Sequence, residues 1–386
     1  MIPGTPAGMS VRAAGEDIAA EETETAEDPC VRIIMVGDML MHKFVVDSGL
    51  REDGSYNFDH LFTYTADRIR GADIAIVNQE TILGGASLGF TGYPTFNSPF
   101  ELGDALTEAG FDIVLQGTNH ALDRSARGIE NCLDFWKNAH PEIAVLGIHD
   151  SAEDQGKMCF AEAHGMRIAI LNYTYGTNGL QTPAGKPYLV DYLVRDRVLA
   201  DLARAEEEAD FTIVCPHWGT EYELAESAYQ RKWMRLFMEN GADLVIGTHP
   251  HVIEPVRWES DDAGHQMLVY YSLGNYVNST ATWKAGVMNR MVGGMAQVDL
   301  ERDADGRVRI RDYAALPLVE HIEGDTVSVC SLWDYSEEQA AVSRVKKQDP
   351  GFSVAACRRL IGRVWPGLYE KSMRVYGQEK GADDEG

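Results

Sequence analysis

Residues 31–38 read Val31-Arg32-Ile33-Ile34-Met35-Val36-Gly37-Asp38, an apolar run rich in β-branched residues that stops at a glycine and a carboxylate. Similar apolar runs, most of them followed by small and polar residues, return at residues 72–77, 111–115, 143–146, 168–173, 211–214, 244–246 and 267–271. Continuous apolar runs of this length are typical of strands that are buried on both faces of a sheet. We therefore expect buried strands at the centre of the protein.

Helical patterns separate several of these runs. Apolar residues recur at helical spacing over residues 100–109, 195–209 and 229–240, and Gly241 is a suitable stop for the last of these helices. Strands that alternate with helices predict an α/β fold. After residue 295 the pattern changes, because residues 298–300 and 308–310 flank Asp305-Gly306, which predicts a closing antiparallel hairpin.

The two ends of the chain differ from the part between them. Residues 1–29 are rich in Asp and Glu and contain almost no large apolar side chains, so we expect a disordered acidic spacer. Residues 30–325 are the expected core domain, and residues 326–386 are the expected helical C-terminal extension. The sequence contains no signal-peptide core and no apolar run of about 18 residues that would span a bilayer. The protein is therefore either cytoplasmic or the continuation of an upstream anchor that has been removed.

Charge limits the classes of partner. The chain has 34 Lys and Arg against 60 Asp and Glu, a formal net charge of -26. Binding to nucleic acid needs clustered Lys and Arg to neutralise phosphates, so we expect no nucleic-acid partner. The six cysteines are scattered without a Cys-x-x-Cys pair, which indicates neither a zinc ribbon nor a dense disulfide framework.

Polar residues that can bind metal follow the apolar runs. They are Asp38, Glu80, Asn119, His120, His217, His249 and His251. Ligands of α/β proteins gather at the carboxyl ends of the strands, so we expect these side chains to meet at one site. Mixed oxygen and nitrogen donors suit Mn, Fe or Zn, and Glu80 is the natural bridge if two ions bind. Each motif alone is also typical of an ordinary turn, but the whole set predicts a metal centre.

The order of these motifs resembles a known family. The chain contains, in this order, Gly37-Asp38, Asn78-Gln79-Glu80, Asn119-His120-Ala121-Leu122-Asp123, His217-Trp218-Gly219-Thr220-Glu221-Tyr222, Gly247-Thr248-His249-Pro250-His251 and Tyr271-Ser272-Leu273-Gly274-Asn275. Over about residues 31–300 this series resembles the CapA/PgsA poly-γ-glutamate capsule biosynthesis proteins, a branch of the calcineurin-like metallophosphatase superfamily. The resemblance implies a four-layer αββα sandwich of the metallo-dependent phosphatase type. It also implies a place on the outer face of a bacterial membrane.

The resemblance assigns roles to the motif residues. It implies that Asp38 and His251 are ligands of a first metal ion and that Glu80 bridges to a second. The second ion would take Asn119, His217 and His249. His120 resembles the catalytic histidine of the superfamily, and Asp123 is placed to orient its ring. The expected cofactor is one or two divalent ions.

The chain departs from the family pattern at several positions. The opening Asp-x-His of the superfamily is missing, so His42 is either a substitute or an exposed histidine that binds nothing. Thr248 stands where the branch often has another histidine, which leaves a one-metal site open. Glu221 is either a partner that orients His217 or a solvated loop carboxylate. The resemblance places Ser272 and Asn275 at the rim of the pocket.

Three functions fit these features. The first is a metal-dependent hydrolase of the capsule pathway, with His120 as proton donor. The second is a non-catalytic scaffold or polymer-handling subunit of a poly-γ-glutamate synthase or export complex. The third is a phosphoesterase that acts on small phosphate compounds. The expected partners are an anionic polymer or phosphate substrate and the synthase or export subunits.

Overall fold

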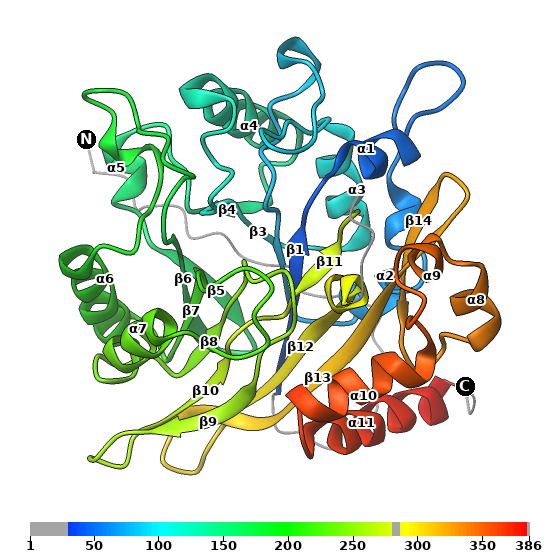
Figure 1. The fold of residues 1–386 in the computed structure, drawn as a ribbon. Helices are drawn as coiled ribbons and strands as arrows, with labels where there is room; N and C mark the ends of the chain where they lie inside the picture. The colour runs from blue at the N-terminus through cyan, green and yellow to red at the C-terminus, as the bar shows by residue number, and fades with distance from the viewer. Residues whose placement is uncertain (1–29, 280–285, 384–386) are drawn as a thin grey trace, which may run out of the picture.

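The protein contains two mixed sheets with helices on their outer sides (Figure 1). The structure, a computed structural model, describes residues 30–279 and 286–383. The acidic spacer predicted at residues 1–29 lies outside the described residues. Within the described part of the chain, no helix is both long enough and apolar enough to cross a membrane.

The first sheet has eight strands, and the strand formed by residues 31–39 lies in its middle. Its order is β14 (Thr326–Ser331), β13 (Val308–Glu323), β12 (Val292–Arg302), β1 (Val31–Met39), β2 (Ile74–Asn78), β3 (Ile113–Leu115) and β4 (Ala144–Leu146), with β11 (Asn275–Val277) paired to the end of β1. Strands β1 to β4 run parallel, whereas β12, β13 and β14 are antiparallel to their neighbours. Strand β1 therefore brings the parallel and antiparallel halves together.

The second sheet has six strands. Its order is β5 (Cys159–Ala163), β6 (Met166–Thr174), β7 (Phe211–His217), β8 (Leu244–Ile246), β10 (Gln266–Tyr270) and β9 (Val256–Ser260). Its inner four strands run parallel, and the two edge strands are antiparallel to their neighbours. The predicted apolar runs are therefore buried strands of two sheets.

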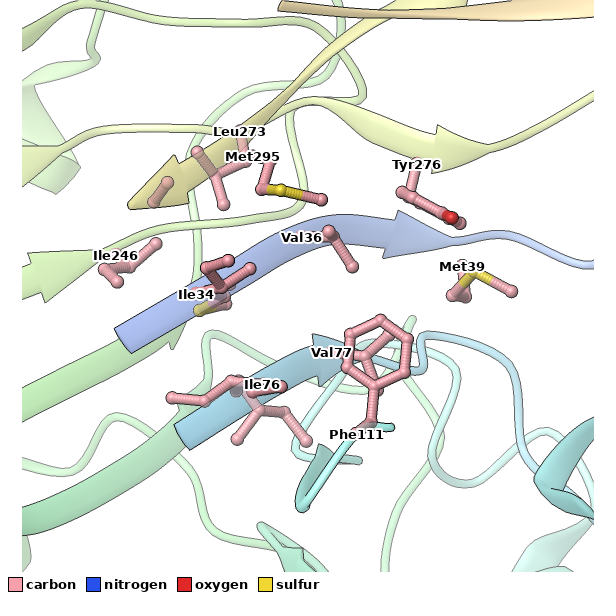
Figure 2. Close-up of a cluster of buried hydrophobic side chains, with 14 of the residues drawn as sticks. Ile34, Val36, Met39, Ile76, Val77, Phe111, Ile246, Leu273, Tyr276 and Met295 are labelled. Carbon is pink, nitrogen blue, oxygen red and sulfur yellow. The ribbon is translucent and has the colours of Figure 1, made fainter. Parts of the chain in front are cut away.

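The two sheets pack face to face around an apolar core. Met35 of β1 meets Cys215 of β7, with their sulfur atoms 3.8 Å apart. Val36 lies between its sheet neighbours Val77 of β2 and Met295 of β12 (Figure 2). All of these side chains are buried, which accounts for the continuous apolar runs in the sequence.

Helices cover the outer faces and complete four layers. The second sheet packs on α6 (Arg195–Glu208) and α7 (Ala228–Met238), and the first sheet shares its core with α2 (Ala66–Arg70), α3 (Glu101–Ala109) and α4 (Ser125–Ala139). The remaining helices are α1 (Lys43–Ser48), α5 (Ala152–Gln155), α8 (Glu337–Val342), α9 (Arg344–Gln348), α10 (Val354–Val364) and α11 (Leu368–Asp383), with short 3₁₀ turns η1 (Asp59–Leu61), η2 (Ala86–Leu88), η3 (Pro187–Leu189) and η4 (Val287–Met291). The predicted α/β sandwich is confirmed. Helix α4 was not among the predicted helices, although its buried residues do repeat at helical spacing.

The C-terminal segment is more than a helical extension. Residues 326–331, predicted as part of that extension, form strand β14 at the edge of the first sheet. Farther on, the Trp365 indole donates to the carbonyl of Glu254 at 2.8 Å, and the Ala315 amide in β13 donates to Ser372 at 3.1 Å. The segment starts as a strand because residues 326–331 continue the pairing of the long strand β13. The helices that follow pack against the core domain.

Backbone contact at the end of β1 requires glycine. The Asp38 amide donates to the carbonyl of Gly274 at 2.9 Å. A Cβ atom on Gly37 would lie 1.9 Å from that carbonyl oxygen, and one on Gly293 would lie 1.9 Å from the Asn275 oxygen. Only a residue without a side chain allows these strands to approach so closely. Glycine here therefore sets the distance between β1 and the loop before β11.

We expect Gly37→Ala to destabilise the protein strongly, because the added methyl group meets backbone that cannot move aside cheaply. The free energy of unfolding should fall by about 3 kcal/mol, the upper end of the usual cost of overpacking. The control is Gly362→Ala in α10, where nothing lies within 4 Å of an added Cβ. That change should stabilise the helix by roughly 0.5–1 kcal/mol. Urea unfolding of both variants tests this, and a Gly37→Ala protein as stable as the wild type would contradict it.

A buried histidine ties the two sheets together near their carboxyl ends. Residue Ile148 pairs with Val190, and Thr174 at the end of β6 pairs with Tyr192, so one segment bridges both sheets. His149 lies beside this segment, with Nε2 2.6 Å from an Asp191 oxygen. Its Nδ1 lies 3.3 Å from Asp154. Burial alone would lower the pKa of His149, but hydrogen bonds to the two carboxylates outweigh it and raise the pKa to about 9.

Protonated His149 should therefore stabilise the fold in a pH-dependent way. Its folded pKa of about 9 exceeds the ordinary 6.5, so its contribution is complete below the lower value and is lost as the pH rises through the upper one. The contribution should be roughly 1–3 kcal/mol. The test is urea unfolding of wild type and His149→Gln at about pH 6 and about pH 10. The gap between the two proteins should shrink at the higher pH, and an equal gap at both would contradict the assignment.

Candidate metal centre

The carboxyl ends of both sheets converge on one buried site. The first sheet supplies Asp38 at the end of β1, Glu80 after β2 and Asn119 after β3, and the second supplies His217 at the end of β7 and the pair His249 and His251 after β8. All six side chains are buried. The structure thus brings together the six residues that the sequence predicted as ligands, three from each sheet.

These residues form two groups of donors that share one carboxylate. One group is Asp38, Glu80 and His251, the other is Glu80, His217 and His249, and within each group the donor atoms lie within 4.8 Å of one another. His251 Nδ1 lies 3.2 Å from Asp38 and 3.7 Å from Glu80, and His217 Nε2 lies 3.7 Å from the other Glu80 oxygen. Asn119 Oδ1 lies 2.8 Å from His217 Nε2 and so adjoins the second group. This division matches the ligand sets that the resemblance implied.

The donors fit a divalent cation. Both oxygens of Glu80 and the Nδ1 atom of His249 are buried, and none of them has a hydrogen-bond partner among the described residues. A buried carboxylate without a partner is costly, and a cation between the groups would supply the missing interaction. Burial raises the pKa of Glu80 well above its ordinary value and lowers the pKa of His217 and of His249 well below it. Metal-binding imidazoles must be neutral, and the lowered pKa of His217 and of His249 favours that form.

Hydrogen bonds fix the orientation of the donors. Asn78 donates to Asp38 Oδ1 at 2.8 Å, and Thr248 Oγ1 lies 3.0 Å from His217 Nδ1. Asn275 Oδ1 lies 3.0 Å from His251 Nδ1. Sequence reasoning did not single out Asn78 or foresee this contact of Thr248, although both flank predicted ligands. Partners of this kind hold metal ligands in place and are part of such sites.

The loop that contains His249 and His251 is strained. Both residues have positive φ, +100° and +58°, which residues with a side chain rarely adopt. The His249 amide lies 3.2 Å and 3.3 Å from the two Asp38 oxygens, so the backbone itself contacts the site. Strain of about 1–3 kcal/mol per residue persists where the surroundings fix the conformation, and it is common at functional sites.

His120 lies beside the two donor groups. One of its ring nitrogens contacts Asp123, and the other faces the donors. Its Nδ1 atom lies 2.7 Å from Asp123 Oδ2, which also accepts the Phe96 amide at 2.7 Å. Its Nε2 atom lies 3.9 Å from Glu80 Oε1. With Nδ1–H donating to the Asp123 carboxylate, Nε2 is the atom that faces the site. His120 is in neither donor group.

Three other predicted site residues do not belong to the donor groups. His42 is half-buried rather than exposed, with its ring 5.2 Å from that of Phe96, but it belongs to neither donor group. Glu221 is exposed, and the nitrogens of His217 face Thr248 and Asn119 instead, which corresponds to the solvated alternative. Ser272 is buried and braces backbone, because its hydroxyl donates to the Val252 carbonyl at 2.8 Å. It does not form part of a pocket rim.

Comparison with known proteins identifies relatives of this chain. Residues 32–280 match the family "Bacterial capsule synthesis protein PGA_cap". The PGA biosynthesis protein CapA of Bacillus subtilis (strain 168) is 22% identical over 303 residues, which cover 75% of this chain and 73% of that protein. The capsule biosynthesis protein CapA of Bacillus anthracis is 26% identical over 260 residues, 65% of this chain and 60% of that protein.

Solved structures with a similar fold include nucleotidases. The NAD nucleotidase (NadN) of Haemophilus influenzae is 12% identical, with a TM-score of 0.49 over 92% of this chain and 68% of that one. A putative 5'-nucleotidase from Staphylococcus aureus is 16% identical, with a TM-score of 0.47 over 75% of this chain and 54% of that one. This chain therefore spans about half of that protein, and a likeness at this level says nothing about substrate.

We expect purified protein to contain one or two divalent ions, and Glu80→Gln to lose most of them, because Glu80 belongs to both donor groups. Saturating metal should raise the wild-type free energy of unfolding by about 4 kcal/mol at a thousand times the dissociation constant. The variant should show little of this increase. Metal analysis and thermal melts with and without chelator measure both effects.

The matched control is Glu320→Gln, which replaces a buried carboxyl in β13 that belongs to neither donor group. It should keep the metal. A wild-type protein that stays metal-free after incubation with Mn, Fe and Zn would refute the centre.

Proposed function

The chain belongs to the bacterial capsule synthesis protein family PGA_cap, and from this membership we propose that it is a metal-dependent hydrolase of capsule biosynthesis. Its substrate is anionic, either a phosphate ester or the poly-γ-glutamate polymer itself. Its partners are subunits of the polymer synthase or export complex, and its place is the outer face of the membrane. The family match and the two CapA relatives support the pathway, and the metal centre supports the type of reaction.

The observation that carries the proposal is the position of His120. Asp123 holds Nδ1, so that Nε2 is directed toward Glu80 at the centre of the donors. The Phe96 ring packs edge-on against the imidazole at 4.7 Å and keeps it from turning. A protein that only holds polymer has no need of a buried, oriented proton donor beside its metal ligands. This pair is what a hydrolytic reaction uses to protonate a leaving group.

The residues of the site would have different roles in such a reaction. Asp38, Glu80, Asn119, His217, His249 and His251 would hold the ions. A divalent ion supplies a Lewis acid that activates water and polarises a phosphoryl or carbonyl oxygen. His120 gives its Nε2 proton to the departing oxygen or nitrogen, and the Asp123 carboxylate stabilises the imidazolium before that transfer. Burial of the centre keeps bulk water from competing for these contacts.

We expect His120→Ala to keep its metal and lose turnover. General acid catalysis contributes about 10²- to 10⁴-fold, so hydrolysis of phenyl phosphate should fall by that order. With 4-nitrophenyl phosphate the loss should be smaller, because that leaving group needs little protonation. Asp123→Asn should lie between wild type and His120→Ala on the poor substrate. Metal analysis and both rates are measured on the same preparations.

The matched control is His140→Ala. His140 also pairs with a carboxylate, Asp104 at 2.7 Å, but it lies at the end of α4 and takes no part in the centre. It should leave both rates unchanged. If His120→Ala loses metal, the histidine is a ligand. If the His120→Ala variant fully restores capsule production in a deletion strain, the scaffold function is correct and the hydrolase function is wrong.

A further inference from the structure

A tyrosine packs against the metal centre from the end of β6, a strand outside the family motifs. Tyr175 directly follows this strand, and its amide donates to the carbonyl of His217 at 3.0 Å. Its ring lies 4.6 Å from the ring of His249. The residue is nevertheless 39% exposed. One side of Tyr175 thus contacts the second donor group, and another side is open to the solvent from which a substrate would enter.

We propose that the Tyr175 hydroxyl donates a hydrogen bond to an oxygen of the substrate's anionic group, a phosphate or a carboxylate, beside the second donor group. The inference rests on the proposed hydrolase function and names a residue that contacts the substrate in that function. A hydrogen bond from a hydroxyl to an ionised oxygen is shorter and stronger than one between neutral groups. A fixed donor of this kind costs no rearrangement when the anion arrives.

The interactions of Tyr175 indicate where its hydroxyl hydrogen points. Burial, then Glu221 and Glu80, raise the pKa of Tyr175 to about 12, whereas a hydrogen bond with Asn119 acts in the opposite direction. A hydrogen bond lowers the pKa of a phenol when the phenol oxygen is the acceptor, because the bond then favours the ionised form. Asn119 therefore donates, and the hydroxyl keeps its own hydrogen for another acceptor. At neutral pH the phenol retains that hydrogen.

The position of the hydroxyl is fixed relative to the ligands. Asn119 Oδ1 lies 2.8 Å from His217 Nε2, and Asn119 Nδ2 donates to Asn178 at 3.3 Å. The side chain that contacts the Tyr175 hydroxyl is thus itself held from two directions. The backbone of Tyr175 is bonded to His217, and its ring is packed on His249. A substrate oxygen bound by this hydroxyl would therefore have a defined place next to the second donor group.

A second tyrosine beside the centre has its hydroxyl hydrogen directed elsewhere. The Tyr222 ring lies 6.0 Å from the ring of His251, and the residue is 44% exposed. Burial and the charge of Glu221 raise the pKa of Tyr222 to about 12, and a hydrogen bond with Glu221 adds to the rise. A hydrogen bond raises the pKa of a phenol when the phenol is the donor. Because its hydrogen is given to Glu221, Tyr222→Phe is a matched control for Tyr175→Phe.

The test measures anion binding as well as turnover. Manganese-loaded wild type, Tyr175→Phe and Tyr222→Phe are titrated calorimetrically with inorganic phosphate and, separately, with glutarate as a carboxylate. Tyr175→Phe should weaken binding of the preferred anion by about 10- to 100-fold, the usual loss for a hydrogen bond to a charged group. Its metal content and melting temperature should stay at the wild-type values, because phenylalanine keeps the ring on His249. Tyr222→Phe should bind both anions like wild type.

The outcomes separate this proposal from the hydrolase function. Weaker binding in Tyr175→Phe alone supports it, and the anion that shows the dependence identifies phosphate or carboxylate as the group bound. Equal binding by wild type and Tyr175→Phe, an equal loss in Tyr222→Phe, or no binding of either anion by wild type overturns it. Loss of metal from Tyr175→Phe also overturns it, because the tyrosine then only supports the ligands.

Turnover of 4-nitrophenyl phosphate completes the comparison. If the bound anion is phosphate, kcat/KM of Tyr175→Phe should fall by about the same factor as phosphate binding. A wild type without turnover, whose anion binding still depends on Tyr175, would refute the hydrolase function and support the anion site. A wild type with turnover, whose anion binding does not depend on Tyr175, would refute the anion site and support the hydrolase function.

Discussion

The buried carboxylate of Glu80 is the group that the surrounding structure is arranged to satisfy. Within the part of the chain that the structure describes, its two oxygens have no hydrogen-bond partner, and they lie among three imidazoles and a second carboxylate. Removing a carboxylate from water without a partner is one of the more expensive steps in folding, and a protein keeps such a group only where something else binds it. The polar neighbours of Glu80 are correspondingly fixed, by Asn78, Thr248 and Asn275. The rest of the fold delivers these groups to one place.

Two sheets are needed for this delivery because neither has the full donor set. Carboxylate and amide oxygens come from the first sheet, and imidazoles come from the second. The face-to-face packing of the sheets, with Met35 against Cys215, therefore sets the distances between oxygen and nitrogen donors. Glycines at positions 37 and 293 add a further condition, because they let β1, β12 and the loop before β11 approach within backbone contact. The packing of the core therefore also fixes the geometry of the site.

Most of the residues of the centre could be predicted from the sequence because of the geometry of parallel strands. Their carboxyl ends meet at one edge, so a polar residue after each apolar run is expected to reach a common site. The rule does not identify residues that act through contacts made only in the fold. Asn78 donates to Asp38 and Thr248 contacts His217, and neither contact can be inferred from the order of the motifs. The reach of β13 was also underestimated, since Pro317 interrupts the apolar pattern of a strand that continues to Glu323. Glu221 belongs to the His217 motif, yet it lies in a turn and is exposed.

The position of β1 in the middle of the first sheet has a consequence for how the protein matures. Asp38 is synthesised early, but the loop it must meet is separated from it by 211 residues at His249, and Asn275 comes later still. Contacts so distant in sequence close late in folding, and a metal site built from them has no affinity to offer before then. An ion would therefore bind only after the chain has been made at least as far as His251, in the compartment where it folds. The metal supply of that compartment, together with the ligand set, would then decide which ion such a site binds.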